Sequence, residues 1–90
     1  MADETAEEIT QHFTACGHSV DLVNGYVAGT YPGMDDESTD EKKATVGRNV
    51  EHLELQSGQD WYTSDSVSRT SPANKTAIAS AITAGNTYTS

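Results

Sequence analysis

The chain has 90 residues, a net charge of −9 from 14 acidic against 5 basic residues, and a hydrophobic share of only 34%. This length predicts one domain over residues 1–90, and the apolar share falls short of the usual figure of about 45–50%, so we expect a small core and marginal stability. The negative charge argues against direct binding of nucleic acid or anionic membrane surfaces, and no apolar run approaches the roughly 20 residues of a membrane-spanning helix.

The N-terminal segment and the cysteine content indicate the compartment in which the chain is made. The segment is acidic, whereas a secretory signal peptide is basic and then apolar. A secreted domain of this size usually carries paired cysteines, and Cys16 is the single one here. We therefore expect a cytoplasmic protein.

The first predicted helix runs from about residue 5 to 16. It opens with a capping box, in which the Thr5 hydroxyl accepts from the Glu8 amide and the Glu8 carboxylate reaches back. Gly17 stands where a left-handed residue would end the helix. One apolar face lies between them at helical spacing, formed by Ala6, Ile9, Phe13 and Cys16.

The segment 19–31 is open to two interpretations. Asn24-Gly25 between apolar runs favours a two-residue β-hairpin turn, although a lone hairpin is marginal without a surface to lie against. The alternative is a single helical turn that begins at Ser19 and ends at Asn24-Gly25. The hairpin is the preferred interpretation, and a loop is expected after it.

The second predicted helix runs from about residue 39 to 56. It opens with a second capping box, Ser38 to Glu41. Gly47 weakens it by about 1 kcal/mol relative to alanine, and its small size would permit close approach of another segment. Two apolar faces suggest a helix sandwiched between neighbours: Val46, Val50 and Leu53 on one side, Ala44 and Leu55 on the other.

After an irregular polar segment over residues 57–70, the third predicted helix runs from about residue 72 to 84. Ser71-Pro72 provides an N-cap followed by proline at the first helical position. Gly85-Asn86 is expected to end the helix. The fold prediction is therefore mainly α, a small bundle of three helices with a possible short β-hairpin around Asn24-Gly25.

No residue pattern predicts a metal, a cofactor or catalysis. His12, Cys16 and His18 lie close in sequence, but zinc usually needs four ligands and a fourth could come only from the remote His52 or a carboxylate. A calcium loop that began at Asp35 would need glycine at its sixth position and glutamate at its twelfth, where this chain has Asp40 and Val46, so the pattern fails. No oxyanion hole, nucleophile elbow or phosphate-binding loop can be recognised, so we predict that the protein is not an enzyme.

The aromatic residues are candidate partner contacts. A single tryptophan after a helix usually fills an open edge of the core, and this is the preferred interpretation of Trp61, with an interface anchor as the alternative. The tyrosines are expected mostly in loops and the C-terminal tail, where a partner would contact them. They are Tyr26, Tyr31, Tyr62 and Tyr88.

The stretch Arg48-Asn49-Val50-Glu51-His52-Leu53 resembles a stretch of short structural proteins of tailed, cyanophage-like bacteriophages, as do the later Trp61 and the Ala-Ile-Thr-Ala-Gly run at 81–85. The resemblance covers the C-terminal half and departs from the pattern after Leu55. It implies a virion component, such as a capsid decoration (cement) or tail-associated subunit, located in the virion and in the host cytoplasm during assembly. It implies no active site.

Such a protein would bind other virion proteins in many symmetry-related copies. Arg48 and His52 lie one turn apart and could contact a partner, while Asn49 borders the buried stripe and is expected to bond a backbone group or the Trp61 segment. The alternative is a solvated face with Glu51 and Glu54 as local charge partners. The rival function is an acidic DNA mimic that inhibits a host enzyme, but the acids cluster at two helix starts and are sparse after residue 65.

Overall fold

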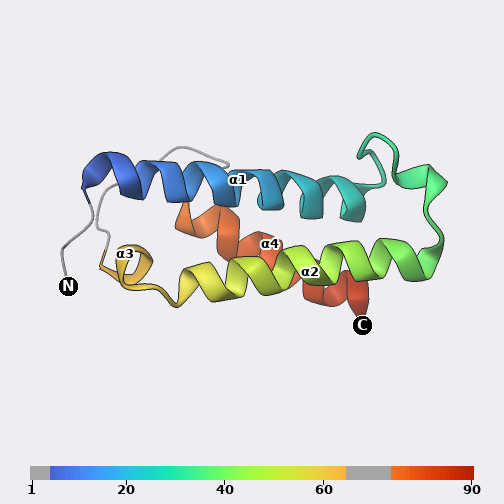
Figure 1. The fold of residues 1–90 in the computed structure, drawn as a ribbon. Helices are drawn as coiled ribbons and strands as arrows, with labels where there is room; N and C mark the ends of the chain where they lie inside the picture. Colours follow the sequence, from blue (N-terminus) through green and yellow to red (C-terminus); the bar gives the residue numbers. More distant parts are fainter. Residues whose placement is uncertain (1–4, 65–73) are drawn as a thin grey trace.

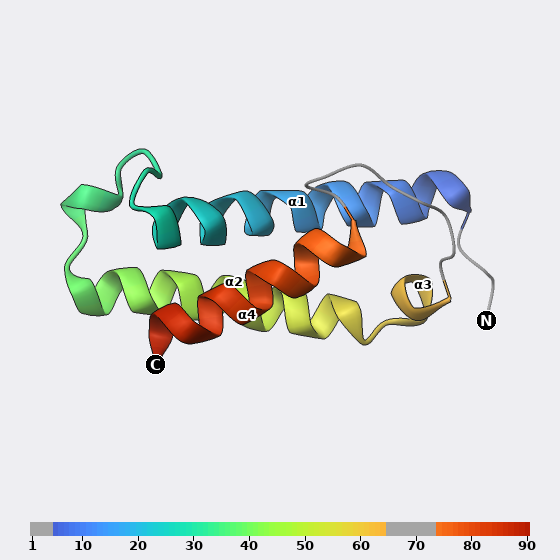
Figure 2. The ribbon, with the colours of Figure 1, turned by 180° about the vertical axis from the view of Figure 1, so that it is seen from behind.

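A computed structural model describes residues 5–64 and 74–90 and is mainly helical, as predicted. Helix α2 runs antiparallel to α1, and α4 crosses the α1–α2 pair diagonally on one side (Figure 1); Figure 2 shows α4 in front of that pair. No strand occurs among the described residues. The elements are α1 (Ala6–Ala28), the 3₁₀ turn η1 (Met34–Asp36), α2 (Thr39–Ser57), α3 (Asp60–Thr63) and α4 (Lys75–Thr89).

Both predicted capping boxes are confirmed. At the start of α1 the Glu8 amide donates to the Thr5 hydroxyl at 3.1 Å, and the Thr5 amide donates to the Glu8 carboxylate at 2.8 Å. Ser38 and Glu41 repeat both bonds with the same lengths at the start of α2. Four amides at the two helix starts, which would otherwise lack partners, are thereby satisfied.

The predicted end of the first helix and the hairpin after it are both wrong, because α1 continues unbroken to Ala28. Phe13, Cys16, Val20 and Val23 follow one another at three- and four-residue spacing, and all are buried, so the helix extends one apolar stripe that an isolated hairpin would have broken. The alternative of a separate turn starting at Ser19 is wrong for the same reason. The helix ends at Gly29, whose φ of 78° is left-handed and favours glycine.

Helix α4 differs from its predicted bounds at the end. The predicted start at Ser71-Pro72 lies outside the described residues; α4 begins at Lys75, with the Asn74 side chain accepting from the Ala77 amide at 2.7 Å. The expected stop at Gly85-Asn86 is wrong, since the helix continues to Thr89.

Gly85 stays inside the helix because α4 packs closely on both long helices at this position. A Cβ atom at Gly85 would collide with Val50 Cγ2, and it would lie 3.2 Å from Val23 Cγ1 and 3.3 Å from Val46 Cγ1. The glycine therefore serves close packing and not termination. Gly47 is the opposite case, because nothing lies within 4 Å of the position of its Cβ.

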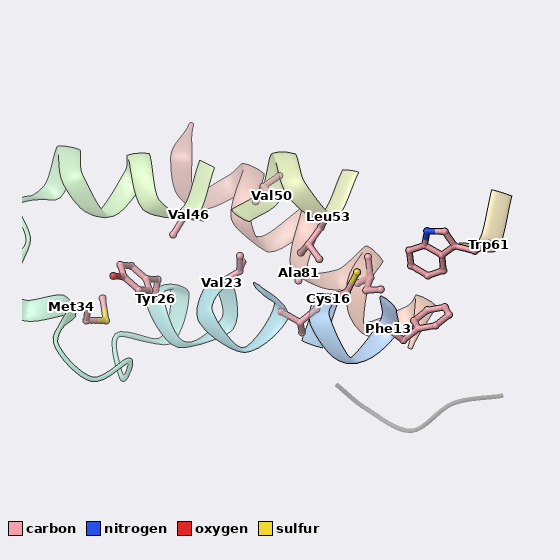
Figure 3. Packing of buried hydrophobic residues seen from close by; sticks show 12 residues of the cluster. Phe13, Cys16, Val23, Tyr26, Met34, Val46, Val50, Leu53, Trp61 and Ala81 are labelled. Carbon is pink, nitrogen blue, oxygen red and sulfur yellow. The ribbon is translucent and has the colours of Figure 1, made fainter. Parts of the chain in front are cut away.

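The core is a narrow strip along a molecule of 43 × 20 × 17 Å. Figure 3 shows Phe13 and Trp61 together at one end and Tyr26 and Met34 at the other, with smaller side chains between them. The aromatic residues thus close the two ends, and aliphatic side chains together with Cys16 fill the middle. The buried set is Phe13, Cys16, Val20, Val23, Tyr26, Met34, Val46, Val50, Leu53, Trp61, Ile78 and Ala81.

Replacing Gly85 by alanine should destabilise the protein. The added methyl group must displace Val50 or shift α4, and overpacking of this kind costs about 1–3 kcal/mol. Gly47→Ala is the matched control, because that position is open and alanine should stabilise the helix by about 1 kcal/mol. Urea unfolding of both variants measures the difference, and equal stabilities would contradict the packing role of Gly85.

Acid should destabilise the protein through its capping boxes. The pKa values of Glu8 and Glu41 lie below the ordinary 4.5 because the amides of Thr5 and Ser38 donate to them. A lowered folded-state pKa contributes stability that is present above about pH 4.5 and is lost as the pH falls through the folded-state value. Glu8→Gln and Glu41→Gln keep the bond without the charge. Their unfolding midpoints should therefore depend less on pH in acid than those of the wild type and of Glu7→Gln; identical pH profiles would refute this.

Candidate partner-binding surface

The outer side of α2 presents polar and apolar side chains together to solvent. Successive residues of a helix are about 100° apart, so positions 48, 51, 52 and 55 fall on the side opposite the buried Val46 and Leu53. Arg48 and His52 are exposed, as predicted. Leu55 is 61% exposed and is one of two large hydrophobic side chains exposed in the described part of the chain, the other being Val27. We call the set Arg48, Glu51, His52 and Leu55 the outer surface of α2.

This surface makes few bonds within the monomer. The Arg48 guanidinium donates to the Thr45 hydroxyl at 3.3 Å, and within the described residues it makes no ion pair with Glu51, so the interpretation of Glu51 as a local charge partner is not supported. The Asn49 amide donates to the Thr45 carbonyl at 2.9 Å, which is the backbone bond expected for it. Asn49 is half-buried, whereas Arg48 and His52 are exposed, so a partner could reach these two side chains.

Tyr26 joins the two long helices at one end of the bundle. Contrary to the loop position expected for it, Tyr26 is buried in α1, and its hydroxyl donates to the Glu37 carboxylate at 2.5 Å. Thr45 of α2 donates to the other oxygen of Glu37 at 3.2 Å. The bond to Glu37 raises the pKa of Tyr26. Tyr31, half-buried in the connecting loop, packs on Tyr26 with ring centres 5.3 Å apart. We call Tyr26, Glu37 and Thr45 the α1–α2 clasp.

Trp61 closes the other end, in agreement with its preferred interpretation as a core plug. It lies in the short helix α3, which was not predicted, and is 7% exposed. The His12 ring stacks on it with centres 4.6 Å apart, and Phe13 meets it edge-on at 5.1 Å. A tryptophan held in this way contributes to the fold of the monomer and does not present its ring to a partner.

The remaining tyrosines are half-buried and not fully exposed. Tyr62 stacks on Phe13 with ring centres 5.7 Å apart, and its ring lies 5.2 Å from the Lys75 ammonium, so it links α3 to the start of α4. Burial raises the pKa of its hydroxyl. Tyr88 packs against the core from the last turn of α4. Partner contact through these residues would therefore use ring edges and hydroxyl groups.

The sequence cluster His12, Cys16 and His18 does not converge in space. His12 turns to Trp61, Cys16 is buried in the core, and His18 is exposed. Burial raises the pKa of the Cys16 thiol, which disfavours the thiolate that a metal or an electrophile needs. Within residues 5–64 and 74–90, no group of three or more His, Cys, Asp or Glu residues could hold a metal ion.

The other surfaces carry less chemistry. A shallow depression on the outer face of α4 is lined by Ala79, Ser80, Thr83 and Ala84, which offer hydroxyl groups and methyl groups but no charge. Among the described helices, none is both long and apolar enough to cross a membrane. The outer surface of α2 is therefore the candidate site with the most varied chemistry.

No protein-family model matches the chain, and neither the curated proteins nor the solved structures contain a match. The assignment of the surface thus depends on the residues themselves. Leu55 is a member of this surface that the sequence did not predict as a partner contact. The sequence does place Leu55 on the side of the helix opposite the buried stripe. That second apolar side was predicted to pack against a neighbouring helix. Within the described part of the chain no neighbour covers it.

Removing the Tyr26 hydroxyl should destabilise the protein more than removing the Tyr62 hydroxyl. Tyr26→Phe deletes a short bond to a carboxylate, and hydrogen bonds to charged groups are the stronger class. Tyr62→Phe is the matched control, because its hydroxyl donates to the Lys75 carbonyl at 3.5 Å, near the limit of a hydrogen bond. Thermal melts of the two variants test this, and a larger loss in Tyr62→Phe would show that the clasp is unimportant.

Proposed function

We propose that this protein is a non-enzymatic structural component of a tailed-phage particle, either a capsid decoration or a tail-associated subunit, and that it binds a neighbouring virion protein through the outer surface of α2. The resemblance of residues 48–53 to short phage structural proteins supplies the context. The protein would then occur in many symmetry-related copies, in the virion and in the host cytoplasm during assembly.

One observation carries the binding surface: the resemblance stretch divides between core and solvent. Val50 and Leu53 are buried beneath α2, whereas Arg48 and His52 project outward beside the exposed Leu55. The buried pair accounts for the fold. The outward residues have no such role in the monomer; arginine is enriched at interfaces and among the residues that contribute most to binding, and the exposed Leu55 adds apolar area that a partner could bury.

In this proposal the tyrosines and Trp61 are not the main partner contacts. Trp61 and Tyr26 are buried, so they support the surface by holding α3 and the α1–α2 connection. Arg48 has a direct link to that support, because Thr45 accepts from Arg48 and donates to Glu37. The clasp thus limits the positions that the Arg48 side chain adopts, which lowers the entropy cost of binding.

The distribution of charge favours this function over DNA mimicry. A mimic needs carboxylates along one continuous face, as phosphates lie along DNA. On the outer surface of α2 the acid Glu51 alternates with Arg48 and His52, and α4 carries no acid at all. Mixed charges of this kind set the orientation and the rate of association with a protein.

Replacing Leu55 by aspartate should weaken binding to particles at least about tenfold, the factor that corresponds to about 1.4 kcal/mol. Arg48→Glu should weaken it as well. Val27→Asp is the matched control, because it places the same charge at the other exposed aliphatic residue, near the far end of α1. Each protein would be titrated onto particles that lack it, at low and high salt, and counted per particle by mass spectrometry.

Binding of the wild type should survive high salt, because apolar contacts are not screened, whereas rim charges are screened within about 8–10 Å. A fixed number of copies per particle, lost in Leu55→Asp and kept in Val27→Asp, supports the proposal. Equal losses in the two aspartate variants would place the contact elsewhere. Absence of the protein from particles, together with salt-sensitive competition against DNA for a host enzyme, would favour the mimic.

A further inference from the structure

The Asn24-Gly25 pair has a chemical property that the proposed function does not use. The amide carbon of an asparagine side chain can be attacked by the backbone nitrogen of the next residue, and a following glycine has no side chain to obstruct the attack. The other asparagines in the described residues precede larger side chains, at Asn49-Val50, Asn74-Lys75 and Asn86-Thr87. Position 24 is therefore the favoured site of this reaction in the unfolded chain.

We propose that Asn24 is a latent site of spontaneous deamidation, kept inactive by α1 and opened when the C-terminal turns of α1 unfold. In the reaction the Gly25 nitrogen bonds to Asn24 Cγ, the Cγ–Nδ2 bond breaks, and ammonia leaves with the proton that the Gly25 nitrogen loses. Water then opens the cyclic imide at either carbonyl. The product is aspartate or isoaspartate at position 24.

The helix blocks the first step even though the Asn24 side chain is exposed. Both residues lie within α1, where the Gly25 amide donates to the carbonyl four residues earlier, and this proton must leave for the ring to close. Closure also requires the Asn24 ψ angle to leave its helical value. The reaction therefore waits for a local opening of the helix end, which is a low-energy event compared with global unfolding.

Isoaspartate at position 24 would prevent the end of α1 from re-forming. This product routes the main chain through the side chain and adds one carbon, so every later residue shifts. Gly25 leaves no room for a shift, because a Cβ there would lie 2.8 Å from the Tyr31 ring. Its carbonyl accepts from the amides of Thr30 at 2.9 Å and Tyr31 at 3.3 Å. The shift would also displace Tyr26 from Glu37 and open the α1–α2 clasp.

The first test compares native and urea-denatured protein in mildly alkaline buffer, with deamidation at each asparagine mapped by peptide mass spectrometry. Asn24 should convert at least about tenfold more slowly in the native protein. In urea it should convert before Asn49, Asn74 and Asn86. Equal native and denatured rates, or an equally fast second asparagine in urea, would overturn the proposal.

Two variants link the reaction to the structure. Tyr26→Phe weakens the clasp and should speed native deamidation of Asn24 several-fold, whereas Tyr62→Phe should not; equal rates would refute the gating by α1 opening. Asn24→Asp adds the charge of the product without lengthening the main chain. It should melt close to the wild type, while purified isoaspartate-24 protein should melt at a clearly lower temperature. Identical melts would show that the shift at Gly25 has no consequence.

Discussion

The close contact at Gly85 is the constraint on which the packing of the chain depends. Helix α4 approaches both α1 and α2 here, and Val23, Val46 and Val50 leave no room for a side chain. Because the approach is close, a few aliphatic side chains, mostly valines with Leu53, Ile78 and Ala81, fill the middle of the core. A chain with so few large hydrophobic residues would not fill a wider space, so the short distance between helices compensates for the low apolar content.

The two ends of this narrow core are closed in different ways. At one end Trp61 covers Phe13 and stacks on His12, so a four-residue helix is held by aromatic contacts. At the other end Tyr26 and Thr45 share the two oxygens of Glu37, and a carboxylate in a loop ties α1 to α2. Tyr26 and Trp61, which were candidate partner contacts because they are aromatic, thus stabilise the fold of the monomer. The outward side of α2 has no such contact with the core, and it is the surface on which the proposed recognition of a partner rests.

Residues 48–53 divide between the core and the solvent, so the packing of α2 and the proposed partner surface depend on the same short stretch. Val50 and Leu53 face the core, whereas Arg48, Glu51 and His52 occupy solvent-facing positions that are free of core packing. Arg48 and His52 occupy the free positions, and Leu55 extends them by one turn.

Much of the fold was determined by local signals in the sequence. The boxes at Thr5–Glu8 and Ser38–Glu41 placed the starts of α1 and α2, because a capping box involves only neighbouring residues. The stripe Val46, Val50 and Leu53 gave the buried face of α2, and its helix ends within one residue of the predicted bound. The exposure of Arg48 and His52 and the backbone bond of Asn49 followed from the same periodicity.

Only the tertiary structure decided whether the glycines end a helix, whether the aromatic residues are buried, and whether Leu55 is exposed. Gly17, Gly25 and Gly85 have the local signature of breaks, yet each lies inside a helix, since packing along α1 and α4 yields more than the helix propensity lost at a glycine, about 1 kcal/mol. Tyr26 and Trp61 became core residues through contacts with Glu37 and His12, which lie 11 and 49 positions away in the chain. Leu55 became a surface residue because no neighbour in the described chain covers that side of α2. The burial or exposure of these residues depends on which distant segments of the chain come into contact, and the local sequence does not determine those contacts.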